Sequence, residues 1–325
     1  MTGLQILSPA DNTAFRIDPG TAATGAQMPV IVAEAAITGM TPDPTPNTTF
    51  TWVVKIHFQC SDCSSGSDKE IDDEFRITSV GGRCPITFPH VRGGDLTITV
   101  SADLATGCYE KISKGLKIQG MNPPRHEINV ACGVVALQKI CCQESGRRQF
   151  DAVPETGVAD CPLFSGDRQG GVGLMQITNP APTDDDHWDW RANIVHGTQI
   201  FDSKRPTASQ YPAAVRGSAA FGQLVQRFNA GRNPPVNVVL PDFTPQQLEL
   251  DMIRGYNGWA GRDAFGHALH EFRVPVDAQG NLQVNLDGGN RGVIAWEQVP
   301  AGDRPHGPGS WGDPNYVANV QEQIP

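Results

Sequence analysis

Alternating apolar and polar residues in the first third of the chain constrain its fold more than any other feature of the sequence. Apolar side chains occupy every second position over Trp52–Phe58 and over Leu96–Val100, and the pattern returns briefly at Leu116–Ile118. A period of two residues puts alternate side chains on opposite faces of a strand, so each segment predicts a half-buried β-strand. The pattern ends before Asn122-Pro123-Pro124, which we interpret as a linker.

Turn-forming residues separate the predicted strands. Clusters rich in Gly, Pro, Asn, Asp and Ser lie at residues 41–47, 61–68, 81–82 and 93–94. Short strands with such punctuation are typical of a β-sandwich. The run from Gly94 to Asp103 also resembles a late strand of bacterial immunoglobulin-like modules. We therefore predict an all-β, immunoglobulin-like sandwich over residues 1–121.

The periodicity becomes helical after the linker. Val130, Val134, Leu137 and Cys141 are spaced to share one face of a helix, and Ser145-Gly146 is expected to end it. Further helices are predicted around residues 190–202, 213–228 and 245–256.

Two segments of the second half depart from the helical pattern. Residues 229–242 are rich in Asn, Gly and Pro and are interpreted as an insertion, whereas residues 272–299 predict a β-hairpin or small sheet. The sequence thus predicts a second domain over residues 122–325 that is mainly α, with a small inserted β-hairpin.

Charge and hydropathy exclude several classes of partner. The 325 residues include 25 Lys and Arg against 35 Asp and Glu, a net charge of −10. Nucleic acid is not expected as a partner, because a phosphate backbone requires a basic face. No apolar run approaches the ~20 residues of a membrane span. No secretory signal is recognisable at the N-terminus, so we expect either a mature form or export by another route.

The cysteines allow two interpretations. Four lie in each half of the chain: Cys60, Cys63, Cys84 and Cys108, then Cys132, Cys141, Cys142 and Cys161. Even numbers favour disulfides formed in an oxidising compartment. The alternative is a zinc site made by the first four, although the second pair lacks the close spacing of a zinc ribbon. In the second half, adjacent Cys141 and Cys142 cannot easily pair with each other, so reduced thiols are the alternative there.

Four motifs follow one another in the second half. Glu144-Ser145-Gly146 ends a predicted helix, and Gly173-Leu174-Met175-Gln176 follows a glycine-rich segment. Asn193-Ile194-Val195-His196-Gly197 and then Gly255-Tyr256-Asn257-Gly258 come after them. In this order the motifs resemble the goose-type lysozyme and soluble lytic transglycosylase superfamily, which cleaves the glycan strands of bacterial peptidoglycan. The resemblance covers residues 125–325 and implies a lysozyme-like domain without a metal or organic cofactor.

The resemblance assigns the general acid to Glu144. Glycoside cleavage needs an acid that protonates the leaving oxygen, and a carboxyl group serves near neutral pH when its pKa is raised. An apolar helix and the partial negative charge of its C-terminus would both disfavour a carboxylate at Glu144. The alternative is a solvated glutamate at a helix end.

The resemblance also assigns a substrate-binding set. Gly173, Met175 and Gln176 match the segment that lines the floor of the sugar cleft, and Tyr256 and Asn257 match the Tyr-Asn pair near the acid. Glycine permits close approach of backbone to glycan, and the Gln176 amide can donate and accept hydrogen bonds. The alternatives are that Met175 only packs in the core and that Tyr256 caps a helix end.

A second carboxylate would distinguish two reactions. In a lytic transglycosylase one glutamate acts as acid and then as base, whereas a goose-type lysozyme uses an aspartate to position water. Asp167 matches one aspartate proposed for that role, and Thr178 stands where the other would be. Asp167 could equally pair with Arg168 or cap a turn. Other departures are the long loop at residues 152–165 and Gly258-Trp259 in place of the usual Ala-Gly.

Three further clusters have simpler interpretations. His267, His270 and Glu271 suggest a metal site but lack the metalloprotease spacing, so we interpret the two histidines as surface residues. Asp184–Asp186 before Trp188 and Trp190 could border a sugar cleft, but an acidic helix N-terminus is simpler. The run Asp68–Glu74 lacks the EF-hand pattern and predicts a solvated loop.

The predicted function is cleavage of the β-1,4 bond between N-acetylmuramic acid and N-acetylglucosamine, in the periplasm or outside the cell. The N-terminal domain would tether the enzyme to a phage tail, a secretion apparatus or a wall component. Two alternatives remain from the sequence: a non-catalytic protein that binds the wall through the same fold, and an assembly component.

Overall fold

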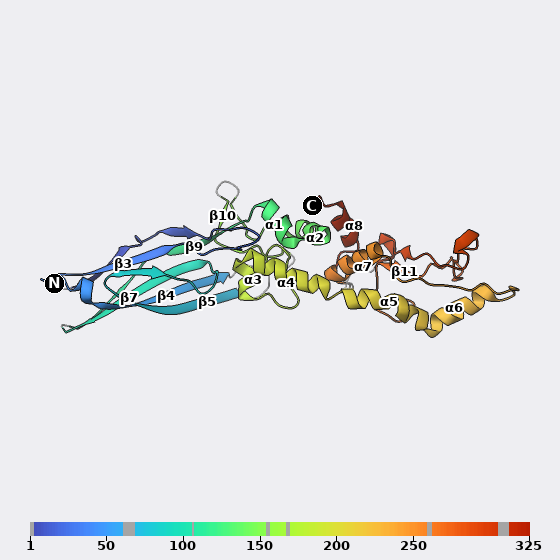
Figure 1. Cartoon of the computed structure of the whole chain (residues 1–325), viewed down its shortest axis with the longest axis horizontal. Coiled ribbons are helices and arrows are strands. Elements are labelled where there is room, and N and C mark those ends of the chain that lie inside the picture. The colour runs from blue at the N-terminus through green and yellow to red at the C-terminus, as the bar shows by residue number, and fades with distance from the viewer. Residues whose placement is uncertain are drawn as a thin grey trace. The chain divides into compact units, whose positions relative to one another are not determined.

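A β-sheet region spanning residues 3–121 is followed by a mainly helical region, as the two periodicities of the sequence predict (Figure 1). The computed structural model describes residues 3–60, 69–105, 107–153, 157–166, 170–258, 262–304 and 312–325.

The strands of the first region form two sheets. They are β1 (Gly3–Ser8), β2 (Ala14–Arg16), β3 (Ile31–Thr38), β4 (Thr49–Cys60), β5 (Lys69–Val80), β6 (Arg83–Ile86), β7 (Gly94–Leu104), β8 (Gly107–Ile112) and β9 (Leu116–Met121). One sheet has the order β1-β3-β6. The other has the order β10-β9-β7-β4-β5, with β2 beside β9 and β8 beside β7. Its edge strand β10 (Val158–Ala159) comes from the second half of the chain.

Strands β4 and β7 confirm the alternation predicted from the sequence. Trp52, Val54 and Ile56 on β4 are at most 2% exposed, as are Ile98 and Val100 on β7. The two strands pair antiparallel with Trp52 opposite Val100 and Val54 opposite Ile98, so buried residues face buried residues across the ladder. Burial of these alternate side chains supplies the core of the β region.

The prediction of a solvated loop over Asp68–Glu74 was wrong for the part that the structure describes. Residues 69–74 belong to β5, which pairs with β4 along its whole length. Only Ile71 of this strand is buried, because the other face is directed toward solvent. Ile71 is the only apolar residue over residues 69–74, so this stretch shows no apolar alternation, which explains the error.

The helices of the second region begin after the linker. They are α1 (Arg125–Cys132), α2 (Val135–Ser145), α3 (Asp184–Trp188), α4 (Trp190–Asp202), α5 (Arg205–Gly217), α6 (Ala219–Asn229), α7 (Pro245–Asn257) and α8 (Tyr316–Glu322). Short 3₁₀ turns lie at Thr45–Asn47, Gly288–Asn290 and Ala301–Asp303. Among the described residues, no helix has the length and apolarity needed to cross a membrane.

Two predicted helices are each divided in the structure. Gly133 has φ +71° and separates α1 from α2, so Val130 and Val134 are exposed instead of sharing the buried face of Leu137 and Cys141. The helix expected over residues 213–228 consists of α5 and α6. Ser218 caps the start of α6, where its hydroxyl accepts the backbone N–H of Phe221. Such a cap satisfies an otherwise unpaired N–H and favours a new start there.

The chain forms two compact units, Met1–Gly133 with Glu144–Gly197, and Val134–Gln143 with Thr198–Pro325. The core of the second contains Tyr211, Val215, Phe272, Ile294 and Trp296. The predicted border between domains at residue 122 stays a prediction.

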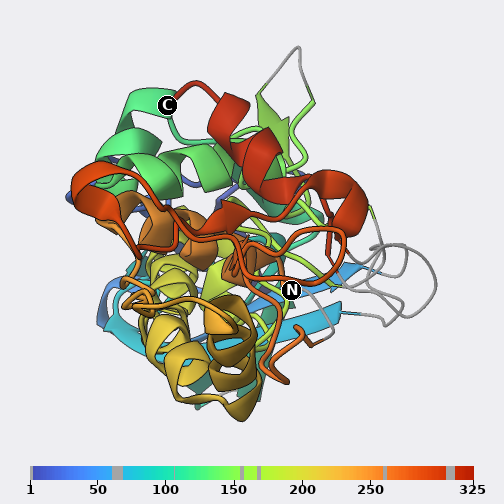
Figure 2. The same cartoon turned by 90° about the vertical axis from the view of Figure 1, so that its right-hand side faces the viewer.

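The small sheet predicted over residues 272–299 is confirmed, because β11 (Phe272–Arg273) pairs antiparallel with β12 (Glu297–Gln298). In the same unit, α8 lies beside the first part of α2 (Figures 1 and 2), where Lys139 Nζ donates to the carbonyl of Gln321. Gln323 also donates to Gln143.

Candidate functional site

The Gly173–Gln176 motif forms a tight turn in the first compact unit. Val172 and Ile177 close it with two backbone hydrogen bonds of 3.2 and 3.1 Å. Gly173 has φ +70° and Gln176 has φ +47°, which is uncommon for a residue with a side chain. The Gln176 amide donates back to the carbonyl of Gly173 at 2.8 Å. Its amide nitrogen therefore stabilises the turn.

The amide side chains of Gln149 and Asn193 are fully buried and bond to the backbone of this turn. We name these two residues the amide cluster. Both are 0% exposed. Gln149 Oε1 accepts the N–H of Leu174 at 3.2 Å, and Asn193 Oδ1 accepts the N–H of Met175 at 2.9 Å. A Cβ atom at Gly173 would lie within 2.7 Å of both amides, so this position requires glycine for space as well as for its φ.

Helix α4 packs closely against Met175. A Cβ atom at Gly197 would lie 2.6 Å from Cβ and Cγ of Met175, and Met175 is 0% exposed. Asn193 and Gly197 are four residues apart on this helix, so both face the turn. Packing accounts for the burial of Met175, and its predicted contact with glycan stays a prediction.

Helix α3 is joined to the amide cluster through its backbone. Gln149 Nε2 donates to the carbonyls of Asp186 and His187 at 2.8 and 2.9 Å. The Asp186 carboxylate, 1% exposed, accepts from the backbone and hydroxyl of Thr183 and lies 2.8 Å from Nδ1 of His196. The simpler interpretation of Asp184–Asp186 as an acidic helix N-terminus is confirmed, because Thr183 and Asp186 form a capping box.

The alternative interpretation, in which Trp188 and Trp190 border a sugar cleft and stack on sugar rings, was wrong. Trp188 and Trp190 are both 0% exposed. The ring of Trp188 packs edge-on against Phe58, and Trp190 Nε1 donates to the carbonyl of Pro19. Both indoles are therefore part of the core.

Glu144 is the last residue but one of α2 and belongs to the same compact unit as the turn. It is half-buried, and Gly146 with φ +61° follows the helix, as the sequence predicts. Ser145 is buried, and its hydroxyl accepts the N–H of Arg148 at 3.2 Å. Only four residues lie between Glu144 and Gln149, so the predicted acid is close in the chain to the amide cluster.

Tyr256 and Asn257 are the last two residues of α7 and belong to the second compact unit. Both polar atoms of the Asn257 side chain bond to the backbone of Asp313, at 3.0 and 3.2 Å. The Asp313 carboxylate accepts in turn from Asn319 in α8. Asn257 therefore fixes the chain before α8, and its predicted role in binding substrate stays a prediction.

The remaining predicted catalytic residue is not placed. Asp167 lies outside the described residues. Thr178, which stands in place of the other aspartate, is exposed, and its hydroxyl donates to the carbonyl of Gln176 at 3.2 Å.

Six of the described cysteines form no disulfide bond, so the predicted framework is not formed among them. They are Cys84, Cys108, Cys132, Cys141, Cys142 and Cys161. Cys161 comes within 3.8 Å of Cys60, a sulfur from the other half of the chain. Cys84 and Cys108 lie on β6 and β8, which belong to different sheets, and among the described residues neither belongs to a group of side chains that could hold a metal ion. Cys63 lies outside the described residues.

The interpretation of His267 and His270 as surface histidines was wrong for His270. His270 is 4% exposed and Glu271 is 0% exposed. His270 Nδ1 lies 2.7 Å from the Asp251 carboxylate, which also accepts the N–H of Glu271. This segment is not helical, so the spacing of the two histidines does not align them.

Glu271 belongs to a charged cluster, which we define as Asp251, His270, Glu271 and Arg304. Its carboxylate accepts from Gln298 at 2.8 Å and from Arg304 at 2.5 Å. Burial raises the pKa of Glu271, and the bond from Gln298 and the charge of Arg304 oppose that rise. The ring of Tyr211 stacks on His270 at 3.8 Å between centroids. The cluster ties α7 to β11 and β12 and is interpreted as structural.

A cavity of about 360 Å³ lies beside β9 and β10 and contains none of the predicted site residues. Its lining includes Arg16, Gln119, Asp151 and Cys161.

Comparisons with protein-family profiles, with curated proteins and with solved structures found no match. The case for a function therefore depends on the motif residues and on how they pack.

Proposed function

We propose that this protein cleaves the β-1,4 bond between N-acetylmuramic acid and N-acetylglucosamine in peptidoglycan, with Glu144 as general acid. The proposal includes a lysozyme-like fold for the helical region and an immunoglobulin-like fold for the β region. It rests on the motif resemblance, and one observation supports it. Two separated motifs pack together in one compact unit, because Asn193 and Gly197 contact the Gly173–Gln176 turn, and Gln149, five positions after Glu144, also bonds to that turn.

The proposed reaction requires the Glu144 carboxyl group to change its protonation state. Glu144 protonates the glycosidic oxygen as the bond breaks, and an oxocarbenium-like centre develops on the muramic acid ring. If the sugar's own C6 hydroxyl then attacks, the Glu144 carboxylate takes the proton of that hydroxyl and no second carboxylate is needed. If water attacks, Asp167 is the candidate to position it.

Placement of the enzyme at its substrate is assigned to the β region. The net charge of −10 does not favour attraction to anionic wall polymers. We therefore assign the β region to tethering, on a phage tail, a secretion apparatus or a wall component in the periplasm or outside the cell. Pull-down of such an apparatus by residues 1–121 would test this assignment.

Digestion of purified peptidoglycan tests the catalytic proposal. We expect Glu144→Gln to lower the rate by about 10²- to 10⁴-fold, because a positioned general acid contributes that much. The matched control is Glu322→Gln, which changes an exposed glutamate at the end of α8 and should keep the wild-type rate.

Mass spectrometry of the products separates the two reactions. Anhydromuramic ends identify a lytic transglycosylase and remove any catalytic need for Asp167. Reducing ends identify a lysozyme and assign Asp167 to water. Binding to sacculi without products from the wild type would reject the enzyme and favour the alternative of a non-catalytic wall-binding protein.

A further inference from the structure

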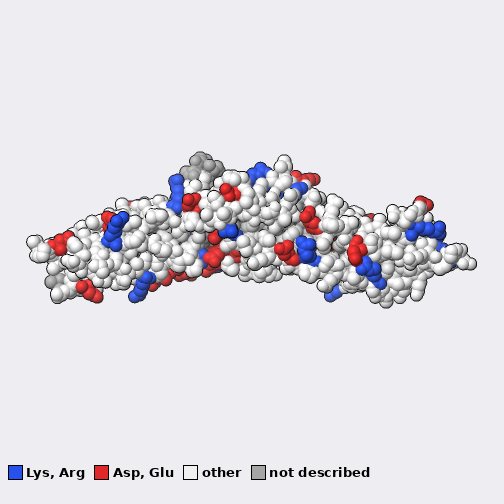
Figure 3. Space-filling model, in the orientation of Figure 1, with Lys and Arg blue, Asp and Glu red and all other residues white. Residues whose placement is uncertain are grey.

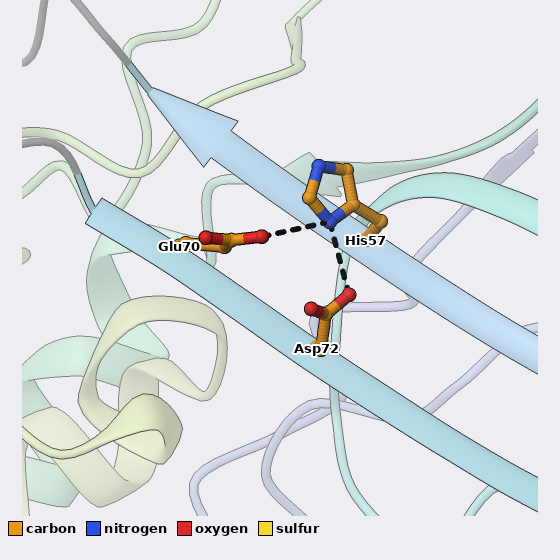
Figure 4. A group of neighbouring side chains, drawn as sticks. All are labelled: His57, Glu70 and Asp72. Carbon is orange, nitrogen blue, oxygen red and sulfur yellow. Dashed lines mark hydrogen bonds and ion pairs between the residues drawn. The ribbon is translucent and has the colours of Figure 1, made fainter.

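One histidine and two carboxylates meet on the β4–β5 ladder, at residues of β5 that the sequence predicted to be a solvated loop. His57 lies directly opposite Asp72 in the antiparallel register, and Glu70 is two residues from Asp72 on the same face of β5. Figure 4 shows the imidazole of His57 facing both carboxylates. Because successive residues of a strand point to opposite faces, the register alone brings these three side chains together.

The distances between the donor atoms suit a first-row divalent metal. His57 Nδ1 lies 3.0 Å from Asp72 Oδ1 and 3.8 Å from Glu70 Oε1, and one donor atom from each residue lies within 4.8 Å of the others. Ligands bound at about 2.0–2.2 Å in a tetrahedral arrangement lie roughly 3.4 Å apart, which is between the two measured distances. Small rotations of exposed side chains would bring all three donors to one ion.

The types of donor favour zinc over the hard cations. Imidazole nitrogen suits zinc, whereas magnesium and calcium prefer oxygen ligands alone. Three protein ligands leave the fourth position of a tetrahedral ion to water.

Lys55 competes with a metal for the same carboxylate. Its Nζ lies 3.0 Å from Asp72 Oδ1, the atom that also contacts His57. The pair is exposed, with 43% and 46% of the two side chains accessible, so its contribution to stability is small. A divalent ion can therefore displace the ammonium group.

We propose that His57, Glu70 and Asp72 form a zinc-binding site on the outer face of the β4–β5 ladder, separate from the residues assigned to glycan cleavage. In this site the ion cross-links two neighbouring strands.

Isothermal titration of the tag-free, chelator-treated full chain with zinc chloride tests the site. Because free thiols also bind zinc, the informative quantity is the difference between variants. We expect both His57→Gln and Asp72→Asn to lose one equivalent of zinc relative to the wild type. Loss of an outer-shell partner already weakens metal binding about 10- to 100-fold, and loss of a ligand should weaken it at least as much.

Two further variants sharpen the test. His126→Gln is the matched control, because His126 contacts a single carboxylate, that of Glu127 at 3.1 Å, and its loss should leave zinc binding unchanged. Lys55→Gln should bind zinc more tightly than the wild type because the competing charge is gone. Equal zinc binding by the wild type and either ligand variant overturns the proposal, as does the absence of zinc binding by the wild type. Circular dichroism confirms that each variant is folded.

Discussion

The two compact units bury polar side chains in opposite ways. In the first, the neutral amide cluster of Gln149 and Asn193 holds the backbone of the Gly173–Gln176 turn. In the second, the charged cluster joins α7 to β11 and β12 through Glu271 and Arg304. Both groups are almost fully buried.

The two arrangements differ in how they respond to a change of pH and to the loss of a partner. A buried amide bonded to the backbone fixes a loop in one geometry and does not titrate. A buried carboxylate depends on its partner, because an uncompensated charge costs far more than a lost hydrogen bond. We therefore expect the loop around the motif to be insensitive to pH, and the junction of α7 with the small sheet to be sensitive to it.

The largest expected effect is the loss of a charged partner in the second unit. Arg304→Met should destabilise the protein by about 3–5 kcal/mol, because it leaves Glu271 as a buried carboxylate without its cation. The measurement is urea unfolding at pH 7, with Arg273→Met as the control. Arg273 pairs with Glu297 and Asp303 while 38% exposed, so that substitution should cost at most about 1 kcal/mol. Equal losses from the two substitutions would falsify the distinction.

In the first unit, the corresponding test is the close packing of Gly197 against Met175, which involves no charge. Gly197→Ala should destabilise it by about 1–3 kcal/mol, because the new methyl group overlaps Met175. Gly222→Ala in α6 is the matched control, since its added Cβ would meet no atom within 4 Å beyond the nearby backbone of its own helix. Replacing glycine by alanine inside a helix should there raise stability by roughly 0.5–1 kcal/mol. Urea midpoints that shift in the same direction for both variants would argue against the packing of α4 on the turn.

The sequence correctly predicted strands in which one face is apolar. It did not predict elements whose side chains are mostly polar. The alternation at Trp52–Phe58 identified β4 because its inward residues meet apolar partners. The same argument missed β5, which has only Ile71 buried and an acidic outer face. Gly133 divides α1 from α2 through its backbone conformation, which apolar spacing does not reveal.

The site was predictable only where its residues lie in motifs. Asn193 and Gly197 belong to a motif that was recognised in the sequence. The structure explains their spacing of four residues, because both contact Met175. Gln149 gave none, because its partners are backbone atoms of distant segments. His270 was misjudged for a related reason, since its partner Asp251 is 19 residues away in the chain.

A carboxyl group introduced into the amide cluster would make the stability of the first unit depend on pH, as we expect for the second unit. Asn193→Asp keeps the shape, but one carboxylate oxygen would face the carbonyls of Val172 and Asp186, to which the amide now donates. The new carboxyl must stay protonated to donate, so its pKa in the folded state would lie above the unfolded value of about 3.9. The stability of the variant should then fall as pH rises above about 4, by about 1–3 kcal/mol at pH 7.

Unfolding of this variant and of the wild type from pH 4 to pH 8 measures the difference. Asn290→Asp, which changes an exposed asparagine, serves as the control and should show no such loss. A variant whose stability is independent of pH would mean that the cluster accommodates charge.

The smallest effect expected is the proton linkage of Glu271 itself. Burial raises its pKa in the folded protein, so its protonated form stabilises the fold most below the unfolded value of about 4.3, and this contribution is lost as pH rises through the folded value. Glu271→Gln removes the ionisation and keeps an oxygen that Gln298 and Arg304 can use. Wild type and variant should therefore be close in stability at pH 4, and the wild type should fall behind as pH rises, by about 1.4 kcal/mol for each unit of pKa shift. Glu249→Gln, an exposed glutamate on α7, should follow the wild type at every pH. If Glu271→Gln instead loses stability relative to the wild type as pH rises, the bond from Arg304 outweighs the cost of burying the charge, and the second unit is stabilised by the ion pair.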